Sequence, residues 1–234
     1  MLNIPKLYEV LMKKLVYNLI LPFAFVAILL WSVIGVSQFR PFFSWQYHKL
    51  NRAQAIGIRH EDLMDVTDGL LSYMIGTREN LDMQYGVKGE MRQIFDQREK
   101  LHMVDVKNLY LGVVHIACVL SVAVALAAAF LVKKDGAKTA KATLKKKYKF
   151  AAAGLLLVAA VFGGVIVTNF QWFWYNFHLV FFTNDLWLLD PAVSIMINMF
   201  PLEFFYAICA AILAVFVLLC GGVYLCLCGR KDKV

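Results

Sequence analysis

The chain has 234 residues, 61% of them hydrophobic, and a formal net charge of +8. This composition, with its positive mean hydropathy, excludes an ordinary soluble domain and favours an integral membrane protein. Four runs of roughly 20 apolar residues are long enough to cross a bilayer as helices. We therefore predict an all-α integral membrane protein with four transmembrane helices, at residues 16–38, 109–132, 150–167 and 204–227.

The placement of lysine and arginine predicts the orientation, because these residues concentrate in the cytoplasmic segments of membrane proteins. Basic residues precede the first run, fill the loop between the second and third runs, and follow the fourth. All three segments, and therefore both termini, are predicted to be cytoplasmic. The charge thus indicates topology and contact with anionic membrane lipids rather than nucleic-acid binding. The residues concerned are Lys6, Lys13, Lys14, Lys133, Lys134, Lys138, Lys141, Lys145, Lys146, Lys147, Lys149, Arg230, Lys231 and Lys233.

The first run exceeds the apolar core of a usual signal peptide, so we predict an uncleaved membrane anchor. Residues 39–108 then lie outside as a cap, inserted into a single membrane domain that comprises residues 1–234. The cap is too small for a full core of its own and is expected to rest on the bilayer or on the spans. Phe43, Trp45 and Tyr47 alternate with polar residues, a pattern that fits a short strand or the start of a helix.

Two helices are predicted within the cap. Apolar residues recur at helical spacing over residues 61–75, and Gly76 is placed to end that helix. Gly86 and Gly89 mark a loop. A second helix is predicted to begin near Glu90 and to run directly into the second span.

Three ionisable residues precede the second span at a spacing of three: Glu99, His102 and Asp105. On a helix they lie on adjacent faces and can interact. Ionisable groups near membrane depth indicate a functional site by default. Glu99 equally suits a solvated position on a helix, so its role stays open.

A second polar group follows the third span: His178, Asn184, Asp185 and Asp190. The topology predicts the same outer side for both groups, and packing of the four spans can bring them together. One interfacial histidine is usually a hydrogen-bonded structural residue, whereas two with acids nearby favour a site. The asparagine and the two aspartates equally suit the caps of local turns or helix starts.

Residues 169–205 are dense in aromatic side chains. At a membrane interface such residues usually anchor or pack a helix. Next to titratable groups they are also candidates for the walls of an apolar substrate pocket. The candidate wall residues are Trp172, Trp174, Phe177, Phe181 and Trp187.

The sequence contains no GxSxG, HExxH, Walker or dinucleotide-binding motif. His102, Asp105, His178 and Asp190 are of types that bind metals, but no spacing specifically supports a metal site. We therefore expect neither a metal nor another cofactor. The five cysteines lie in the spans or at their ends, which excludes disulfides in the outer segments.

These two polar groups and their surroundings resemble the bacterial lipoprotein intramolecular transacylases, four-span membrane proteins with an extracellular cap. The resemblance implies an acyltransferase of the bacterial cytoplasmic membrane. It moves the sn-2 acyl chain of a diacylglyceryl lipoprotein to the α-amine of the same N-terminal cysteine, giving the lyso-form. Ser194 departs from the pattern, which has an aspartate there. The residues that carry the resemblance are Glu99–Lys107, Phe177, His178, Phe182, residues 184–187 and 189–191, and Pro201–Phe205.

The resemblance further implies that His102 and His178 are catalytic, at the extracellular interface. One neutral histidine would accept the proton of the attacking amine, and the other would stabilise the oxyanion. Which does which stays open, and Asp105 or Asp190 is expected to hold a ring nitrogen. Two other functions also stay open: a metal-dependent membrane lipid hydrolase, and a non-enzymatic membrane sensor or assembly protein whose cap binds a partner.

Overall fold

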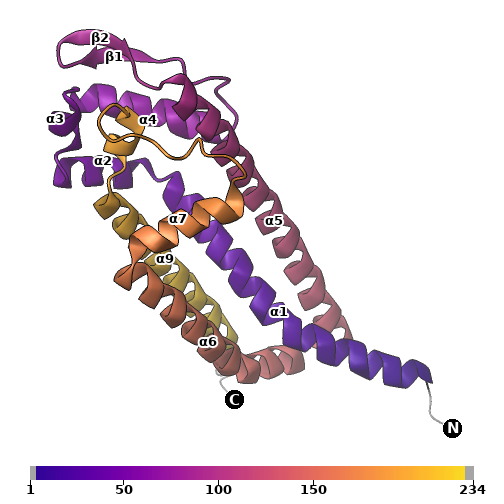
Figure 1. Ribbon diagram of the computed structural model, residues 1–234. Helices are drawn as coiled ribbons and strands as arrows, with labels where there is room; N and C mark the ends of the chain where they lie inside the picture. Colours follow the sequence, from indigo (N-terminus) through magenta and orange to yellow (C-terminus); the bar gives the residue numbers. More distant parts are fainter. Residues whose placement is uncertain (1–3, 230–234) are drawn as a thin grey trace. The chain divides into compact units, whose positions relative to one another are not determined.

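The computed structural model describes residues 4–229, which are mostly helical (Figure 1). Within that range the chain forms nine helices and one two-stranded sheet. Arg230, Lys231 and Lys233, predicted to be cytoplasmic, lie outside the described residues. The elements in chain order are α1 (Ile4–Ser37), α2 (Arg40–Lys49), α3 (Arg52–Ile56), α4 (His60–Met74), β1 (Gln84–Val87), β2 (Glu90–Gln93), α5 (Gln97–Asp135), α6 (Ala137–Thr168), α7 (Phe170–Phe181), α8 (Ile195–Met199) and α9 (Leu202–Cys228).

Four of these helices, α1, α5, α6 and α9, are long and apolar enough to cross a membrane. The prediction of four transmembrane helices is therefore confirmed. Each helix begins before its predicted apolar run, because the run marks the part that suits lipid whereas flanking polar residues also form helix. Helix α1 contains Pro22 in its interior, as membrane helices tolerate.

The basic segment between the second and third spans is helical, which corrects the predicted loop. Helix α5 ends at Asp135 and helix α6 begins at Ala137. Gly136 separates them with a φ of 78°, a conformation that glycine adopts without steric cost. Because alanine and lysine are strong helix formers, the lysine-rich sequence continues both helices up to this one-residue break.

The chain packs into two compact units. The first contains the described residues up to 32, residues 115–173 and those from 213 onward. The second contains residues 33–114 and 174–212. The second unit thus combines the whole predicted cap with most of the aromatic stretch that follows the third span. The boundary of a single domain with an inserted cap stays a prediction.

The first unit is held by contacts among its four long helices. Its core contains buried residues from each of them, including Tyr17, Leu131, Tyr148 and Phe216. The Tyr148 hydroxyl donates to the carbonyl of Cys220 at 2.7 Å, which ties α6 to α9. These contacts come from side chains that the hydropathy pattern alone does not distinguish from lipid-facing ones.

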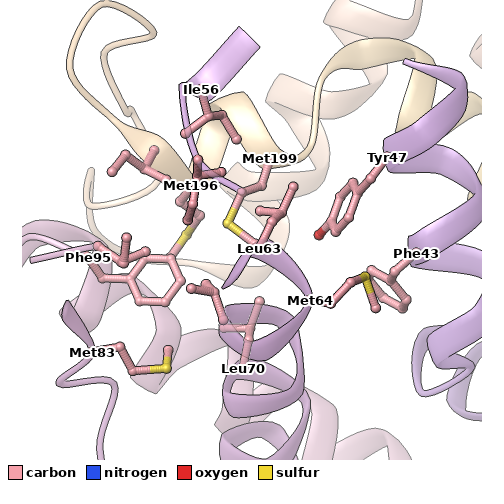
Figure 2. Close-up of a cluster of buried hydrophobic side chains, with 14 of the residues drawn as sticks. Phe43, Tyr47, Ile56, Leu63, Met64, Leu70, Met83, Phe95, Met196 and Met199 are labelled. Atoms are coloured by element: carbon pink, nitrogen blue, oxygen red, sulfur yellow. The ribbon is translucent and has the colours of Figure 1, made fainter. Parts of the chain in front are cut away.

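The core of the second unit surrounds α4 (Figure 2). Leu63 of α4 and Phe95, which precedes α5, have no exposed surface. Met199 of α8 is equally buried and lies in the same cluster. The cap was predicted to be too small for a core of its own, and the residues that complete its core come from beyond the third span.

The predicted helix over residues 61–75 is confirmed as α4, and Gly76 follows it with a φ of 83°. Of the two alternatives for the segment around Phe43, the structure adopts the helix, α2. Phe43 and Tyr47 are one helical turn apart and are buried, whereas Trp45 is 56% exposed. The aromatic alternation therefore reflects one buried and one exposed helix face.

The helix predicted to begin near Glu90 begins at Gln97 instead, because residues 84–93 form an antiparallel hairpin. Lys88 and Gly89 occupy its turn with φ values of 54° and 86°. Two-residue hairpin turns of this kind require positive φ at both central positions, which favours glycine. Gly89 was therefore correctly placed in a loop, whereas Gly86 lies within β1, and neither strand was predicted.

A capping box fixes the true start of α5. The Asp96 carboxylate accepts from the backbone N–H of Glu99 at 2.8 Å, and the Glu99 carboxylate accepts from that of Asp96 at 2.7 Å. These reciprocal bonds satisfy two backbone donors that a helix start leaves unpaired. The spacing of the two acids is visible in the sequence and marks this boundary.

Truncating the core of the second unit is predicted to be costly. Phe95→Ala removes a side chain with no exposed surface, and such a change lowers the free energy of unfolding by about 3–5 kcal/mol. Met91→Ala, at a residue that is 70% exposed on the hairpin, is the control and is expected to change it by less than about 0.5 kcal/mol. Thermal unfolding in detergent measures both, and equal melting temperatures would contradict this packing.

Candidate active site

The two predicted histidines lie together in the second unit. The ring centroids of His102, on α5, and His178, on α7, are 6.1 Å apart, and the ring planes differ by 34°. Only 8% of the first residue's surface and 5% of the second's is exposed. The structure therefore brings together the two polar groups that the sequence places on either side of two membrane spans.

The hydrogen bonding of His178 determines its tautomer. Its Nδ1 atom lies 2.7 Å from the carbonyl oxygen of Trp174, and since a carbonyl only accepts, Nδ1 carries the proton. In the neutral ring Nε2 then has a free lone pair and acts as an acceptor. Burial lowers the pKa of His178, although the Trp174 carbonyl acts in the opposite direction. The imidazole is thus neutral over most of the pH range near 7.

His102 has a different environment. Its Nδ1 atom is buried and has no hydrogen-bond partner in the described part of the chain. The ring of Phe182 lies edge-on to the His102 ring, with centroids 5.3 Å apart. The centroid of the Phe182 ring is also 5.5 Å from that of His178. An unpaired buried polar atom is costly in a native protein. This nitrogen is therefore a candidate for contact with substrate.

Aromatic rings enclose His178. Trp187 stacks on the imidazole with centroids 4.6 Å apart, and Trp174 meets it edge-on at the same distance. Phe177 lies 5.5 Å from His178 and 4.8 Å from Phe181. Four of the five predicted wall residues thus belong to the histidines' own unit. The fifth, Trp172, belongs to the first unit and is 57% exposed.

Glu99 is the most deeply buried ionisable residue near the site, with 1% of its surface exposed. One carboxylate oxygen accepts from the Ser194 hydroxyl at 2.5 Å and from the backbone N–H of Met196 at 3.1 Å. The other accepts from the N–H of Asp96, as described above. Glu99 is therefore not a solvated helix residue, and its carboxylate fastens the start of α8 to the start of α5.

Asp105 and Asp185 connect α5 to the segment after α7. The Asp105 carboxylate accepts from the side-chain amide of Asn184 at 2.8 Å. Asp185 lies 3.2 Å from the guanidinium of Arg98, which also donates to its backbone carbonyl. Both links help to place the α7 end of the site against α5. The oxygen of the Asn184 side chain accepts from the N–H of Leu186 and so also stabilises a local turn.

Asp190 has the local role that the sequence left open. Its carboxylate accepts from the backbone N–H of Ala192 at 2.9 Å, and its carbonyl accepts from the N–H groups of Val193 and Ser194. Within the described residues, neither Asp105 nor Asp190 is hydrogen bonded to a histidine ring. No group of three or more His, Cys, Asp or Glu residues among residues 4–229 has a metal-binding arrangement.

Sequence reasoning did not assign Phe182 and Ser194 to the site. Phe182 lies four residues after His178, and this spacing places both on one face of a helix, so the pattern could have revealed it. Ser194 was noted only as a departure from the expected aspartate. Its hydroxyl supplies a hydrogen bond that the buried Glu99 carboxylate needs, a contact that sequence spacing does not reveal.

The sequence model of the lipoprotein intramolecular transacylase Lit family matches residues 18–205, most of the chain. The chain belongs to this family. It is thus a multi-pass membrane acyltransferase, and the resemblance seen in the polar groups is confirmed. No curated protein sequence matches the chain.

Solved structures of a lipoprotein intramolecular transacylase share the fold. An in meso structure of the membrane integral Lit from Bacillus cereus matches with a TM-score of 0.73 and 20% identity, covering 95% of this chain and 99% of that one. Two structures of that protein have a histidine replaced. The arginine variant gives a TM-score of 0.71, 21% identity and 95% coverage of both chains. The alanine variant gives 0.72 and 20%, covering 98% of this chain and 100% of that one.

The Glu99–Ser194 contact predicts a specific loss of stability in this transacylase. Ser194→Ala removes a donor from a buried carboxylate and is expected to lower the free energy of unfolding by about 1–3 kcal/mol. Ser72→Ala is the control, because that hydroxyl makes no hydrogen bond within the described residues, and it is expected to be near neutral. Thermal unfolding of both variants in detergent tests this, and a Ser194→Ala protein as stable as the control would rule out a stabilising contact.

Proposed function

We propose that this transacylase moves the sn-2 acyl chain of a diacylglyceryl lipoprotein to the α-amine of the lipoprotein's own N-terminal cysteine. The observation that carries the proposal is the buried histidine pair, 6.1 Å apart, in a chain of the Lit family. A carbonyl oxygen or its attacking amine needs about 3 Å to each hydrogen-bonding group. The spacing of the rings therefore suits one reacting centre between them.

The reaction forms an amide bond and breaks an ester bond. The α-amine has a pKa of roughly 8, so a substantial fraction is neutral near pH 7.5 and can attack the ester carbonyl. Attack produces an oxyanion and a positively charged nitrogen. A base must then remove the proton from nitrogen, and an acid must return one to the leaving sn-2 oxygen, which becomes the hydroxyl of the lyso-form.

The contacts of the two histidines favour different roles. His178 has its Nδ1 proton on the Trp174 carbonyl, which leaves Nε2 to accept the amine proton and stabilises the imidazolium that forms. His102 is then the residue that donates to the oxyanion. Removal of one such donor costs about 3–4 kcal/mol of transition-state stabilisation. In the Bacillus cereus protein a histidine was also chosen for replacement.

The aromatic walls suit the conformational demand of the reaction. Counted through the thioether, attack of the amine on the sn-2 ester closes a ring of about eight atoms, a size that forms reluctantly. A rigid pocket that folds the headgroup back supplies effective molarity. Trp187, stacked on His178, and Trp174, edge-on to it, are the walls closest to the reacting centre.

The same proposal places the site at the extracellular face of the cytoplasmic membrane, with both termini inside. Its support is the lysine-rich segment at the junction of α5 and α6, because such segments face the cytoplasm. Along the chain, His102 precedes the second span and His178 follows the third, so one span separates each histidine from this segment.

Replacement of either histidine is predicted to abolish lyso-form synthesis. In cells that carry His102→Ala or His178→Ala, mass spectrometry of lipoprotein N-termini should find the diacylglyceryl cysteine unchanged. Wild-type protein should give an N-acyl cysteine with a monoacyl glyceryl group, at the same total number of acyl chains. His48→Ala, in α2, should retain the activity.

The same spectra distinguish the competing functions. A lipid hydrolase would lower the total number of acyl chains, and inhibition by a chelator would support a metal. Lyso-form synthesis by both histidine variants would refute the site assignment. No change in lipoprotein N-termini with or without the wild-type protein would refute the proposed reaction.

The lowered pKa of His178 predicts the shape of the pH profile. Because burial lowers the pKa of His178 below its ordinary value of about 6.5, this residue is mostly neutral above pH 6.5, and titration of the substrate α-amine dominates between pH 6.5 and 8. The logarithm of kcat/KM should rise there with a slope of one, and a second limb should appear only at lower pH. A slope of two between pH 6.5 and 7.5, measured with a diacylglyceryl peptide in detergent, would contradict a neutral histidine.

A further inference from the structure

A small hollow adjoins the histidine pair in the second unit. It has a volume of about 220 Å³ and lies between α5 and the segment that follows α7. Phe182 lines it and also contacts the His102 ring, so the hollow and this imidazole share one aromatic neighbour. The lining residues are Asp105, Asn108, Leu109, Phe181, Phe182, Thr183 and Asn184.

The polar lining offers both acceptors and donors but no cation. One oxygen of the Asp105 carboxylate accepts from Asn184. The other has no hydrogen-bond partner among residues 4–229 and can accept a further bond. The Asn108 amide and the Thr183 hydroxyl likewise make no side-chain hydrogen bond within the described part of the chain. No lysine or arginine lines the hollow, which makes it unsuited to a phosphate group.

We propose that this hollow, called here the peptide subsite, binds the first peptide group after the lipidated cysteine. This rests on the proposed function, because it requires a lipidated N-terminal cysteine as substrate. A peptide group presents one N–H donor and one carbonyl acceptor. The free carboxylate oxygen of Asp105 accepts the N–H, and Asn108 or Thr183 donates to the carbonyl.

Covalent geometry supports this placement. The attacking amine and the first peptide carbon are joined through one Cα atom and lie about 2.5 Å apart. Whatever site holds the amine beside the histidines must therefore accommodate the peptide group next to it. The peptide subsite is a polar hollow that shares Phe182 with His102, whereas the rings around His178 are apolar and suit the lipid.

The peptide subsite also explains how the enzyme can bind lipoproteins whatever residue follows the lipidated cysteine. Its polar atoms come from short side chains, and Asp105 is the only charged residue that lines it. Main-chain groups are common to every peptide, so recognition of the first peptide bond fixes the amine without selecting the second residue. The bound peptide group adds positional restraint, which increases effective molarity.

The test compares two substrates. One is a diacylglyceryl peptide, and the other is a matched depsipeptide in which an ester oxygen replaces the N–H of the first peptide bond. A hydrogen bond to a charged acceptor is worth roughly 10- to 100-fold in binding. With the wild-type enzyme the depsipeptide should therefore show a kcat/KM that is about 10-fold lower or more.

The same two substrates are then compared with the Asp105→Ala variant, which turns the test into a double-mutant cycle. This variant should lower kcat/KM for the peptide by a similar factor and remove the difference between the two substrates, because the acceptor for the N–H is gone. Glu90→Ala, an exposed acid on the hairpin, is the control and should keep the difference. Thermal unfolding in detergent checks that both variants are folded before their activities are compared.

The outcomes separate the subsite from the reaction. Equal kcat/KM values for the two substrates with wild-type enzyme would overturn the peptide subsite while leaving the proposed reaction intact. The ratio of kcat/KM between the two substrates could instead persist in Asp105→Ala while the α-amine titration in the pH profile shifts. That result would overturn the peptide subsite and show that Asp105 binds the α-ammonium group. Failure of wild-type enzyme to convert the diacylglyceryl peptide at all would refute the proposed function itself.

Discussion

The buried carboxylate of Glu99 is the contact on which the arrangement of the site depends. It accepts from Asp96 at the start of α5 and from Ser194 and Met196 at the start of α8. His102 lies one helical turn beyond Glu99 on α5. A buried charge is tolerated only when donors replace water, so the fold must keep all three donors in place. The hydrogen bonds that hold the start of α8 against the start of α5 therefore also determine where the His102 ring lies.

The sequence predicted those parts of the fold that follow from a single local property. Bilayer thickness sets the length of an apolar run, and the four spans were therefore found. The hairpin was missed because its four-residue strands carry no clear alternation, although Gly89 marked the turn. The lysine-rich helices were missed because positive charge was interpreted only as a topology signal. The start of α5 was misplaced although Asp96 and Glu99 form a recognisable capping box.

The site was predicted where residue type and topology were sufficient. Two histidines with acids nearby on one side of the membrane indicated a pair, and their rings do lie together. The hydrogen-bond partners of these side chains were not predictable, because they depend on tertiary packing between segments 79 to 97 residues apart. Asp105 pairs with Asn184 rather than with an imidazole. Ser194, a departure from the expected acid, donates to Glu99, where an aspartate would place a second carboxylate against the first.

The aromatic enclosure has a further consequence for the proposed chemistry. Water competes with the α-amine for the same ester carbonyl, and its attack would release the acyl chain instead of transferring it. Both histidines are almost fully buried among rings, with Trp187 stacked on His178 and Phe182 against both imidazoles. Such walls exclude water while the amine, which is part of the substrate, is already inside. In the proposed reaction the substrate supplies its own nucleophile, and selectivity for transfer over hydrolysis follows from what the pocket admits.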